Sequence, residues 1–227
     1  MEEGVRLEKE FKIEEALKKF ELVLKTNPNH IQALIHASRT ASNIGGHFTD
    51  DAERKPKLLQ AEAYSLRAIR LDPVSTDAHF SLILTLGLQA ESAGSPREKL
   101  KNAKSIRTEA ETILKIDSSY ALAYFVLGKW HQELYKLNWF EKFACELFFG
   151  GLPEGISIDK AVNNFQRALQ LDPENILFMY GQAIALQYEG RKLEAIQLLE
   201  KALKMPLREP DDLQRKEKCV ILLRELK

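Results

Sequence analysis

The sequence predicts an all-α protein, a right-handed α-solenoid of about five helix-turn-helix repeats with insertions and a C-terminal cap helix. Two observations support this fold class. Small and apolar residues recur at helical spacing along the chain, whereas no alternating apolar and polar run bounded by turn residues predicts a strand. One short pattern also returns several times within the 227 residues. We expect residues 1–227 to form a single domain.

The recurring pattern marks the end of a second helix in each repeat. A small residue is followed four residues later by a bulky or small residue, and three residues after that by a small or apolar residue. An Asp-Pro or Asn-Pro pair then ends the helix. The first copy has Ala16, Phe20, Val23 and Pro28. Other copies begin at Ala61, Ala161 and Ala195, and a weaker copy contains Ala110 and Ile113. The pattern resembles the second helix of the tetratricopeptide repeat, a unit of about 34 residues.

The copies set the boundaries of the repeats. We place the repeats at about 1–30, 31–75, 76–120, 121–175 and 176–209, followed by a cap helix over 211–226. In the cap helix we expect Leu213, Cys219, Val220, Leu222 and Leu223 to face the array. A cap is expected because a bare terminal repeat would expose its core.

The three middle repeats contain insertions between their two helices. The small residue of the first helix lies 12 residues before the alanine of the second in the first and last repeats, from Gly4 to Ala16 and from Ala183 to Ala195. The middle repeats are longer by about 11, 11 and 21 residues. We expect the first two insertions to lengthen the second helices, one of them beginning after Ser95. The third insertion is rich in aromatic residues and predicts a further short helix within 137–155.

Composition excludes several classes of protein. Lys+Arg and Asp+Glu are both 33, so no basic excess predicts binding to nucleic acid. No apolar run reaches the roughly 18 residues of a membrane span. No secretory signal peptide is visible, and we expect a cytoplasmic location. Gly4 takes the place of the small residue of the first repeat helix, so this helix is short at its N-terminal end. We therefore also expect that an N-terminal targeting or anchoring segment has been trimmed from before Met1.

Nothing in the sequence predicts catalysis or a cofactor. The five histidines include no pair at the i,i+4 spacing of a helical zinc site, and no cysteine lies near them. No glycine-rich phosphate loop follows a strand. We therefore predict no metal, no cofactor and no enzymatic activity. We expect Cys145 and Cys219, which lie in apolar helical stretches, to be buried structural residues.

Residues 124–226 resemble a narrower family. The motifs are Leu127 to His131, Leu137 to Lys142 and Phe148 to Pro153, followed by Ala161, Phe165 and Ala168. This combination is similar to the C-terminal half of the regulator of microtubule dynamics family. The resemblance implies a helical repeat fold with an aromatic insertion at this place. For animal members it implies microtubule association, and for one branch a role at contacts between endoplasmic reticulum and mitochondria, with a repeat domain that can hold phospholipid.

The first helices of such repeats are expected to line a concave groove. The second, fifth, ninth, twelfth and thirteenth residues of each unit should face it. We predict that a partner contacts Arg39, Asn43, Phe80, Leu84, Phe125, Lys129, Tyr180, Ile184 and Tyr188. The twelfth position also places Ser42 and Gln132 on this face. The groove would be mixed in character near Arg39 and Asn43, and apolar and aromatic in its middle and at its far end.

Two functions fit such a groove. The first is a noncatalytic protein–protein interaction scaffold or adaptor that binds a helical or extended partner segment. The alternative is binding or transfer of a lipid or another apolar ligand in the same groove, as the family branch implies. A third reading is structural: the insertion over 137–155 folds over the groove and buries it. The identity of a protein or peptide partner does not follow from the sequence.

Overall fold

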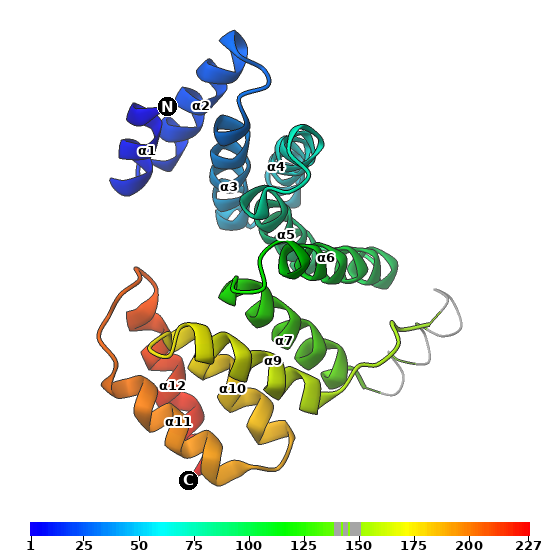
Figure 1. Ribbon diagram of the computed structural model, residues 1–227, viewed down its shortest axis with the longest axis vertical. Coiled ribbons are helices and arrows are strands. Elements are labelled where there is room, and N and C mark those ends of the chain that lie inside the picture. Colours follow the sequence, from blue (N-terminus) through cyan, green and yellow to red (C-terminus); the bar gives the residue numbers. More distant parts are fainter. Residues whose placement is uncertain (139–141, 143–144, 146–150) are drawn as a thin grey trace. The chain divides into compact units, whose positions relative to one another are not determined.

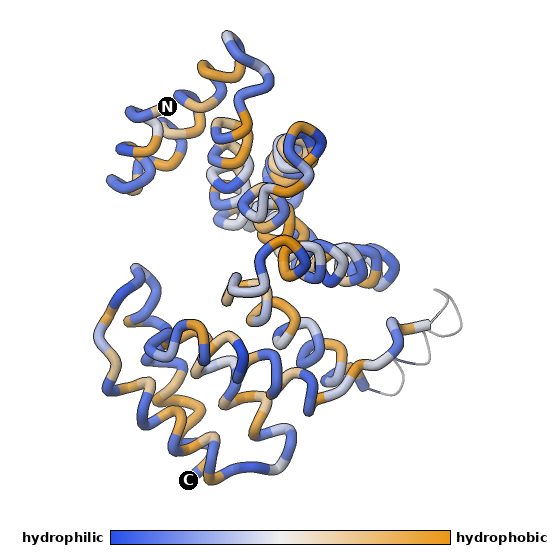
Figure 2. The backbone as a smooth tube through the Cα atoms, viewed as in Figure 1, coloured by the Kyte–Doolittle hydropathy of each residue, from blue (hydrophilic) through white to orange (hydrophobic). Residues whose placement is uncertain are grey.

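The computed structural model describes residues 1–138, 142, 145 and 151–227. Eleven helices and no strand make up these residues, so the predicted all-α solenoid is confirmed. Figure 2 shows hydrophobic and hydrophilic residues alternating along the helices, as expected for helices buried on one side. Most of the aromatic insertion, and with it the predicted short helix within 137–155, lies outside the described residues.

The chain folds as two compact units, residues 1–117 and 118–227 (Figure 1). The helices of unit 1 are α1 (Glu2–Lys9), α2 (Ile13–Thr26), α3 (Ile31–His47), α4 (Asp51–Leu71), α5 (Thr76–Glu91) and α6 (Pro96–Ile116). Those of unit 2 are α7 (Ala121–Lys136), α9 (Ile158–Leu171), α10 (Ile176–Tyr188), α11 (Lys192–Lys204) and α12 (Asp212–Leu226). A single domain over 1–227 stays a prediction.

Each unit is built from stacked helix pairs. In unit 1, α1 packs on α2, α3 on α4 and α5 on α6, and in unit 2, α7 packs on α9 and α10 on α11. The first helices also contact one another, since α3 packs against α5 and α7 against α10. Each unit therefore contains a layer of first helices, which is the layer on which the sequence places the partner-binding residues.

Local sequence signals define the helix ends. Helices α2, α4 and α9 end one residue before the Asn or Asp of an Asn-Pro or Asp-Pro pair. The residue before proline is driven out of the helical region by the proline ring, so the helix stops there. The side chains of Ser75, Ser95 and Ser157 accept hydrogen bonds from backbone N–H groups in the first turns of α5, α6 and α9.

The insertions of the second and third repeats are helical. Helices α4 and α6 contain 21 residues each, whereas α2 contains 14 and α11 contains 13. The start of α6 at Pro96, after the cap residue Ser95, agrees with the sequence prediction. The added turns lie at the N-terminal ends of both helices because the repeat pattern fixes their C-terminal ends.

Small residues on the second helices form the centre of the packing. The alanines that open the repeated pattern are fully buried, as are the phenylalanines four residues later in the first and fourth repeats: Ala16, Ala61, Ala110, Ala161, Ala195, Phe20 and Phe165. Phe20 lies against Gly4 of α1, where an added Cβ would be 2.5 Å from the ring. The ring of Phe165 lies against both Gly128 and Gly181, where an added Cβ would be 2.9 and 2.8 Å away. A glycine is therefore needed at each of these close approaches.

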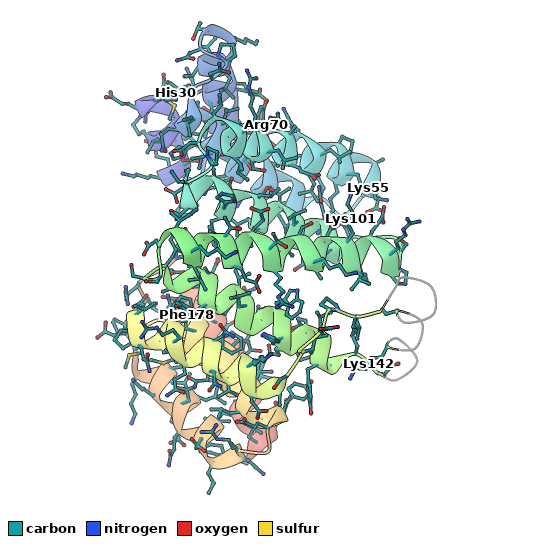
Figure 3. The ribbon with its side chains drawn as sticks, turned by 45° about the vertical axis from the view of Figure 1, so that its right-hand side comes forward. His30, Lys55, Arg70, Lys101, Lys142 and Phe178 are labelled. Atoms are coloured by element: carbon teal, nitrogen blue, oxygen red, sulfur yellow. The ribbon has the colours of Figure 1, made fainter. Side chains whose placement is uncertain are left out.

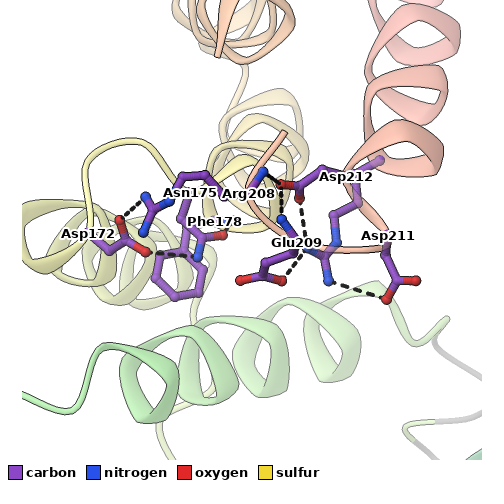
Figure 4. Close-up of polar contacts among 8 residues, drawn as sticks. Asp172, Asn175, Phe178, Arg208, Glu209, Asp211 and Asp212 are labelled. Carbon is purple, nitrogen blue, oxygen red and sulfur yellow. Dashed lines mark hydrogen bonds and ion pairs between the residues drawn. The ribbon is translucent and has the colours of Figure 1, made fainter. Parts of the chain in front are cut away.

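A buried aspartate fixes the cap helix α12 on unit 2 (Figure 4). The side chain of Asp212 is 4% exposed, and its Oδ2 accepts hydrogen bonds of 2.8 Å from the backbone N–H groups of Arg208 and Glu209. Its Oδ1 accepts a 2.8 Å hydrogen bond from Arg215. The next residue, Leu213, is 62% exposed. The expectation that Leu213 faces the array is wrong because Asp212 takes the inward position in the first turn.

The predictions for Cys219, Leu222, Leu223 and Cys145 agree with the structure, whereas Val220 is half-buried and is not part of the core cluster of unit 2. Cys219 and Leu222 are buried, and Leu223 packs against the core of unit 2. Cys145 is also buried, so both cysteines are structural. Burial raises the pKa of the Cys219 thiol to about 11, which keeps the thiol protonated and unreactive near neutral pH.

The close approach of Phe165 to Gly128 predicts opposite effects for two glycine substitutions. Gly128→Ala should lower the free energy of unfolding by about 1–3 kcal/mol because the new methyl group overpacks the ring. Gly87→Ala, in α5, should raise it by about 0.5–1 kcal/mol, since no atom lies within 4 Å of the added Cβ and alanine favours the helix. Urea unfolding at 25 °C measures both. Equal effects of the two substitutions would contradict this packing.

The contacts of Asp212 predict a pH-dependent stability. Burial raises the pKa of its carboxyl, but the backbone hydrogen bonds from Arg208 and Glu209 and the Arg215 guanidinium outweigh burial, so the pKa lies below its usual range. The carboxylate therefore stabilises the fold above the unfolded-state pKa of about 3.9, and this contribution is lost as pH falls through the folded-state pKa.

We expect Asp212→Asn to lower the free energy of unfolding by about 2 kcal/mol at neutral pH. The difference from the unmodified protein should shrink as the pH falls below about 4, where the carboxylate of the unmodified protein also becomes protonated. Urea titrations at several pH values measure this difference. A difference that is constant with pH would show that the charge of Asp212 does not stabilise α12.

Candidate partner-binding surfaces

The four predicted residues of unit 1 lie on α3 and α5. Asn43 is exposed and Leu84 is 40% exposed, whereas Phe80 and Arg39 are half-buried. Helices α3 and α5 pack against each other, so these side chains belong to neighbouring first helices. This surface offers an amide, a cation and an aliphatic side chain.

Arg39 joins the two helices of this surface. Its Nη2 donates a 2.7 Å hydrogen bond to Oδ1 of Asp77, at the start of α5. The two side chains are 33% and 52% exposed, so the ion pair contributes at most about 1 kcal/mol to stability. Its main effect is to orient the guanidinium. A carboxylate on a partner would have to compete with Asp77 for this group.

A second polar network connects α1 to α3 beside this surface. Oε1 of Glu8 accepts a 2.7 Å hydrogen bond from Thr40, and its Oε2 lies 2.8 Å from Nδ1 of His36. The His36 ring also stacks on Phe20, with the ring centroids 5.0 Å apart. These side chains already have partners within unit 1, so they hold the helices together.

In unit 2, the apolar predicted residues are joined to the core. Phe125, Tyr180 and Ile184 are half-buried and pack against the core of the unit. The Phe125 ring stacks on Phe178 at a centroid distance of 5.4 Å and also lies 5.6 Å from Phe165. Burial, with smaller contributions from Cys219 and Glu225, raises the pKa of Tyr180. These residues expose only part of their apolar surface.

The exposed part of the unit 2 surface is a cluster of lysines and tyrosines. Glu133 accepts hydrogen bonds of 2.7 Å from Lys129 and 3.2 Å from Lys136. Burial raises the pKa of Glu133, but the two lysines outweigh it, so the pKa lies below its usual range. Lys136 also lies over the ring of Tyr188, with Nζ 5.4 Å from the centroid. Tyr135 meets Tyr188 edge to face at 6.4 Å.

Sequence reasoning missed Tyr135 and Lys136 because they lie beyond the thirteenth residue of their repeat. The signal that could have found Lys136 is the i,i+3 spacing of Glu133 and Lys136, since oppositely charged residues at this spacing are neighbours on a helix. No comparable signal predicts Tyr135, whose contact with Tyr188 depends on the packing of α7 against α10.

Two residues at the twelfth position of their repeats, Ser42 and Gln132, face inward, whereas Gln187 at the same position is exposed. The Ser42 hydroxyl lies 2.7 Å from that of Thr85, and both side chains are buried. Gln132 is 0% exposed, and its Nε2 donates a 3.2 Å hydrogen bond to the Gly181 carbonyl. The prediction that Ser42 and Gln132 lie on the partner-binding face is wrong because these polar side chains connect one first helix to the next.

Two properties of the described residues bear on other functions. They contain no group of three or more His, Cys, Asp and Glu side chains arranged to hold a metal ion. None of the helices formed by residues 1–138 and 151–227 is long and apolar enough to cross a membrane.

Comparison with known proteins identifies relatives in sequence and in fold. A family model described as "Regulator of microtubule dynamics protein 1-3" matches residues 1–227. Regulator of microtubule dynamics protein 1 of Caenorhabditis elegans is 24% identical over 176 residues, which is 76% of each chain. Human regulator of microtubule dynamics protein 2 is 25% identical over 134 residues, covering 58% of this chain and 32% of the human protein.

Solved structures show the same fold. The tetratricopeptide repeat protein TTC0263 of Thermus thermophilus has a TM-score of 0.72 and 18% identity, over 97% of both chains. MamA has a TM-score of 0.58 and 17% identity, over 97% of this chain and 98% of its own. YrrB, described as a tetratricopeptide repeat protein with an unusual peptide-binding site, has a TM-score of 0.55 and 16% identity, over 98% and 88%. At these identities the likeness shows the fold alone.

The packing of unit 2 predicts different effects for two aromatic residues of its surface. Phe125→Ala should lower the free energy of unfolding by about 3 kcal/mol because the ring contacts Phe165 and Phe178. Tyr188→Ala should lower it by only about 1 kcal/mol, because Tyr188 is half exposed and its contacts with Lys136 and Tyr135 lie at the surface. Urea unfolding measures both values. A loss of stability for Tyr188→Ala as large as that for Phe125→Ala would show that Tyr188 belongs to the core.

Proposed function

Since the chain belongs to the regulator of microtubule dynamics family, we propose that it is a noncatalytic scaffold that binds a segment of a partner protein on its first helices. The observation that carries this proposal is the set of exposed side chains on neighbouring first helices in each unit. Unit 1 exposes Asn43 and Leu84, and unit 2 exposes Lys129 and Tyr188.

The chemistry of these side chains supports a peptide ligand. An extended or helical segment needs apolar anchors and polar groups that fix its register. Leu84 and Tyr188 are anchors of suitable size, and aromatic residues often carry much of the binding energy of an interface. Asn43 and Lys129 offer hydrogen-bond donors beside them. Arg39 would add a cation. We expect the half-buried apolar residues to lie between these anchors and the core of each unit: Phe80, Phe125, Tyr180 and Ile184.

The names of the relatives support microtubules as the first partner to test. Lipid binding, the alternative from the sequence, stays a prediction. The cleft of unit 1 that contains Leu58, Leu59 and Leu86 is lined by neither Phe80 nor Leu84, so it offers no support for a lipid beside those residues. The cytoplasmic location also stays a prediction.

The test is co-sedimentation of the purified protein with polymerised tubulin. We expect a combined Asn43→Ala, Leu84→Asp, Lys129→Ala and Tyr188→Asp variant to bind at least about tenfold more weakly, because the loss of two anchors should cost more than about 1.4 kcal/mol. The matched control is Leu22→Asp with Leu193→Asp, since these leucines are exposed on second helices. The control should bind like the unmodified protein, and equal loss in both variants would contradict the proposed surfaces.

If tubulin does not bind, selection from a displayed peptide library with the same variants tests the wider proposal. Selected peptides should lose affinity for the first variant and keep it for the control. Native mass spectrometry of the purified protein tests the lipid alternative. Co-purified phospholipid at near-equal molar amount, lost in the first variant and kept in the control, would contradict the scaffold function on these surfaces.

A further inference from the structure

The exposed cluster of lysines and tyrosines in unit 2 contains more ammonium groups than carboxylates. Three lysines and one glutamate leave it with a formal charge of +2, although the whole chain has as many acidic as basic residues. Figure 3 shows Lys142 beyond the C-terminal end of α7. We call this set the lysine–tyrosine cluster, and its members are Lys129, Glu133, Tyr135, Lys136, Lys142 and Tyr188.

Glu133 shows how the cluster holds a carboxylate. A single oxygen, Oε1, accepts hydrogen bonds from both Lys129 and Lys136. One carboxylate therefore serves two ammonium groups. The side chains of Lys129 and Glu133 are 48% and 49% exposed, so a carboxylate of a partner can reach the same ammonium groups.

The tyrosine rings and Glu133 restrict the directions of the remaining ammonium groups. Lys136 lies over the ring of Tyr188, and Nζ of Lys142 lies 5.7 Å from the centroid of the Tyr135 ring. Lys142 also donates a 3.3 Å hydrogen bond to the backbone carbonyl of Tyr135. Among the residues that the structure describes, no carboxylate pairs with Lys142. An anion on a partner would complete this contact.

The first-helix surface of unit 1 lacks this excess of positive charge. Its cation, Arg39, already pairs with the carboxylate of Asp77 at 2.7 Å. One arginine and one aspartate balance there, whereas in unit 2 three lysines share the single carboxylate of Glu133. Charge complementarity therefore indicates an acidic ligand for unit 2.

We propose that the lysine–tyrosine cluster binds an acidic segment of a partner protein. The carboxylates of the segment contact the lysines, and its apolar part packs on the half-exposed rings of Tyr135 and Tyr188. The hydroxyl groups of these rings can donate further hydrogen bonds to a carboxylate. This inference rests on the function proposed for the first helices and names the chemical class of segment that unit 2 selects.

The test uses the full chain and the peptide Glu-Glu-Leu-Glu-Glu, N-acetylated and C-amidated. In ¹H–¹⁵N NMR spectra we expect saturable shifts of backbone amides in α7 and at the C-terminal end of α10, with a dissociation constant on the order of 1 mM at low salt. The affinity should fall as salt is added, because salt screens exposed charges. The peptide Gln-Gln-Leu-Gln-Gln should bind at least about tenfold more weakly.

Two variants have opposite expected effects on this affinity. Glu133→Gln should raise it at least about threefold, because it removes the carboxylate that competes for Lys129 and Lys136. Lys136→Gln combined with Lys142→Gln should lower it at least about tenfold while the helical circular dichroism is retained.

Two matched controls exclude an effect of overall charge. Glu111→Gln, on α6 of unit 1, removes a carboxylate that is similarly exposed and also pairs with a cation four residues away. Lys201→Gln removes an exposed lysine of the second helix α11. Both control variants should bind the acidic peptide like the unmodified protein.

Several results would overturn the inference. These are equal binding of the glutamine peptide, an affinity that Glu133→Gln leaves unchanged, and stronger shifts of the same amides by vesicles of anionic phospholipid. Selected library peptides that shift α7 and α10 but carry no acidic residue would overturn the acidic selectivity alone and leave the proposed function intact. If no selected peptide of any charge shifted these amides, the function proposed for unit 2 would fail as well.

Discussion

The packing of phenylalanine rings against glycines of the first helices is the contact on which the first repeat and the last two repeats depend. Phe20 lies against Gly4 in unit 1, and Phe165 lies against Gly128 and Gly181 in unit 2. Each ring fills the space that a side chain would otherwise occupy, so paired helices approach closely while their interface stays filled. Phe165 also connects two successive repeats, because Gly128 belongs to α7 and Gly181 to α10.

This packing determines which surfaces are available for binding. The second helices direct alanines inward, and their buried faces are committed to the repeat interior. The first helices contact their neighbours through buried polar groups such as Ser42 and Gln132, and they expose residues such as Leu84 and Tyr188. The lengthened α4 and α6 extend beyond the repeat pattern, and a cleft lies between them and α5.

Much of the fold could be predicted from local signals. The Asp-Pro pair at Asp72 ends α4, and Ser95 starts α6, because proline geometry and side-chain capping act within a few residues. The inward turn of Gln132 could not be predicted, since it depends on the position of Gly181, 49 residues away. The exposure of Leu213 was also unexpected because hydrophobicity alone favours burial, whereas the backbone N–H groups of Arg208 and Glu209 draw Asp212 inward.

The candidate sites also differ in how far the sequence could predict them. Asn43, Leu84, Lys129 and Tyr188 lie on the first helices because repeat position fixes their direction, and this could be predicted from spacing. The cleft in unit 1 could not, since its wall combines residues of the three helices α4, α5 and α6.

The most direct test of the central claim, that the first helices bind the partner, is site-specific photo-crosslinking in cells. Benzoylphenylalanine would replace Leu84 or Tyr188 on first helices, and Leu22 or Leu193 on second helices; all four are exposed. The account predicts that positions 84 and 188 crosslink to the same partner protein and that positions 22 and 193 do not. Crosslinks to that partner from positions 22 and 193 alone would contradict binding on the first helices.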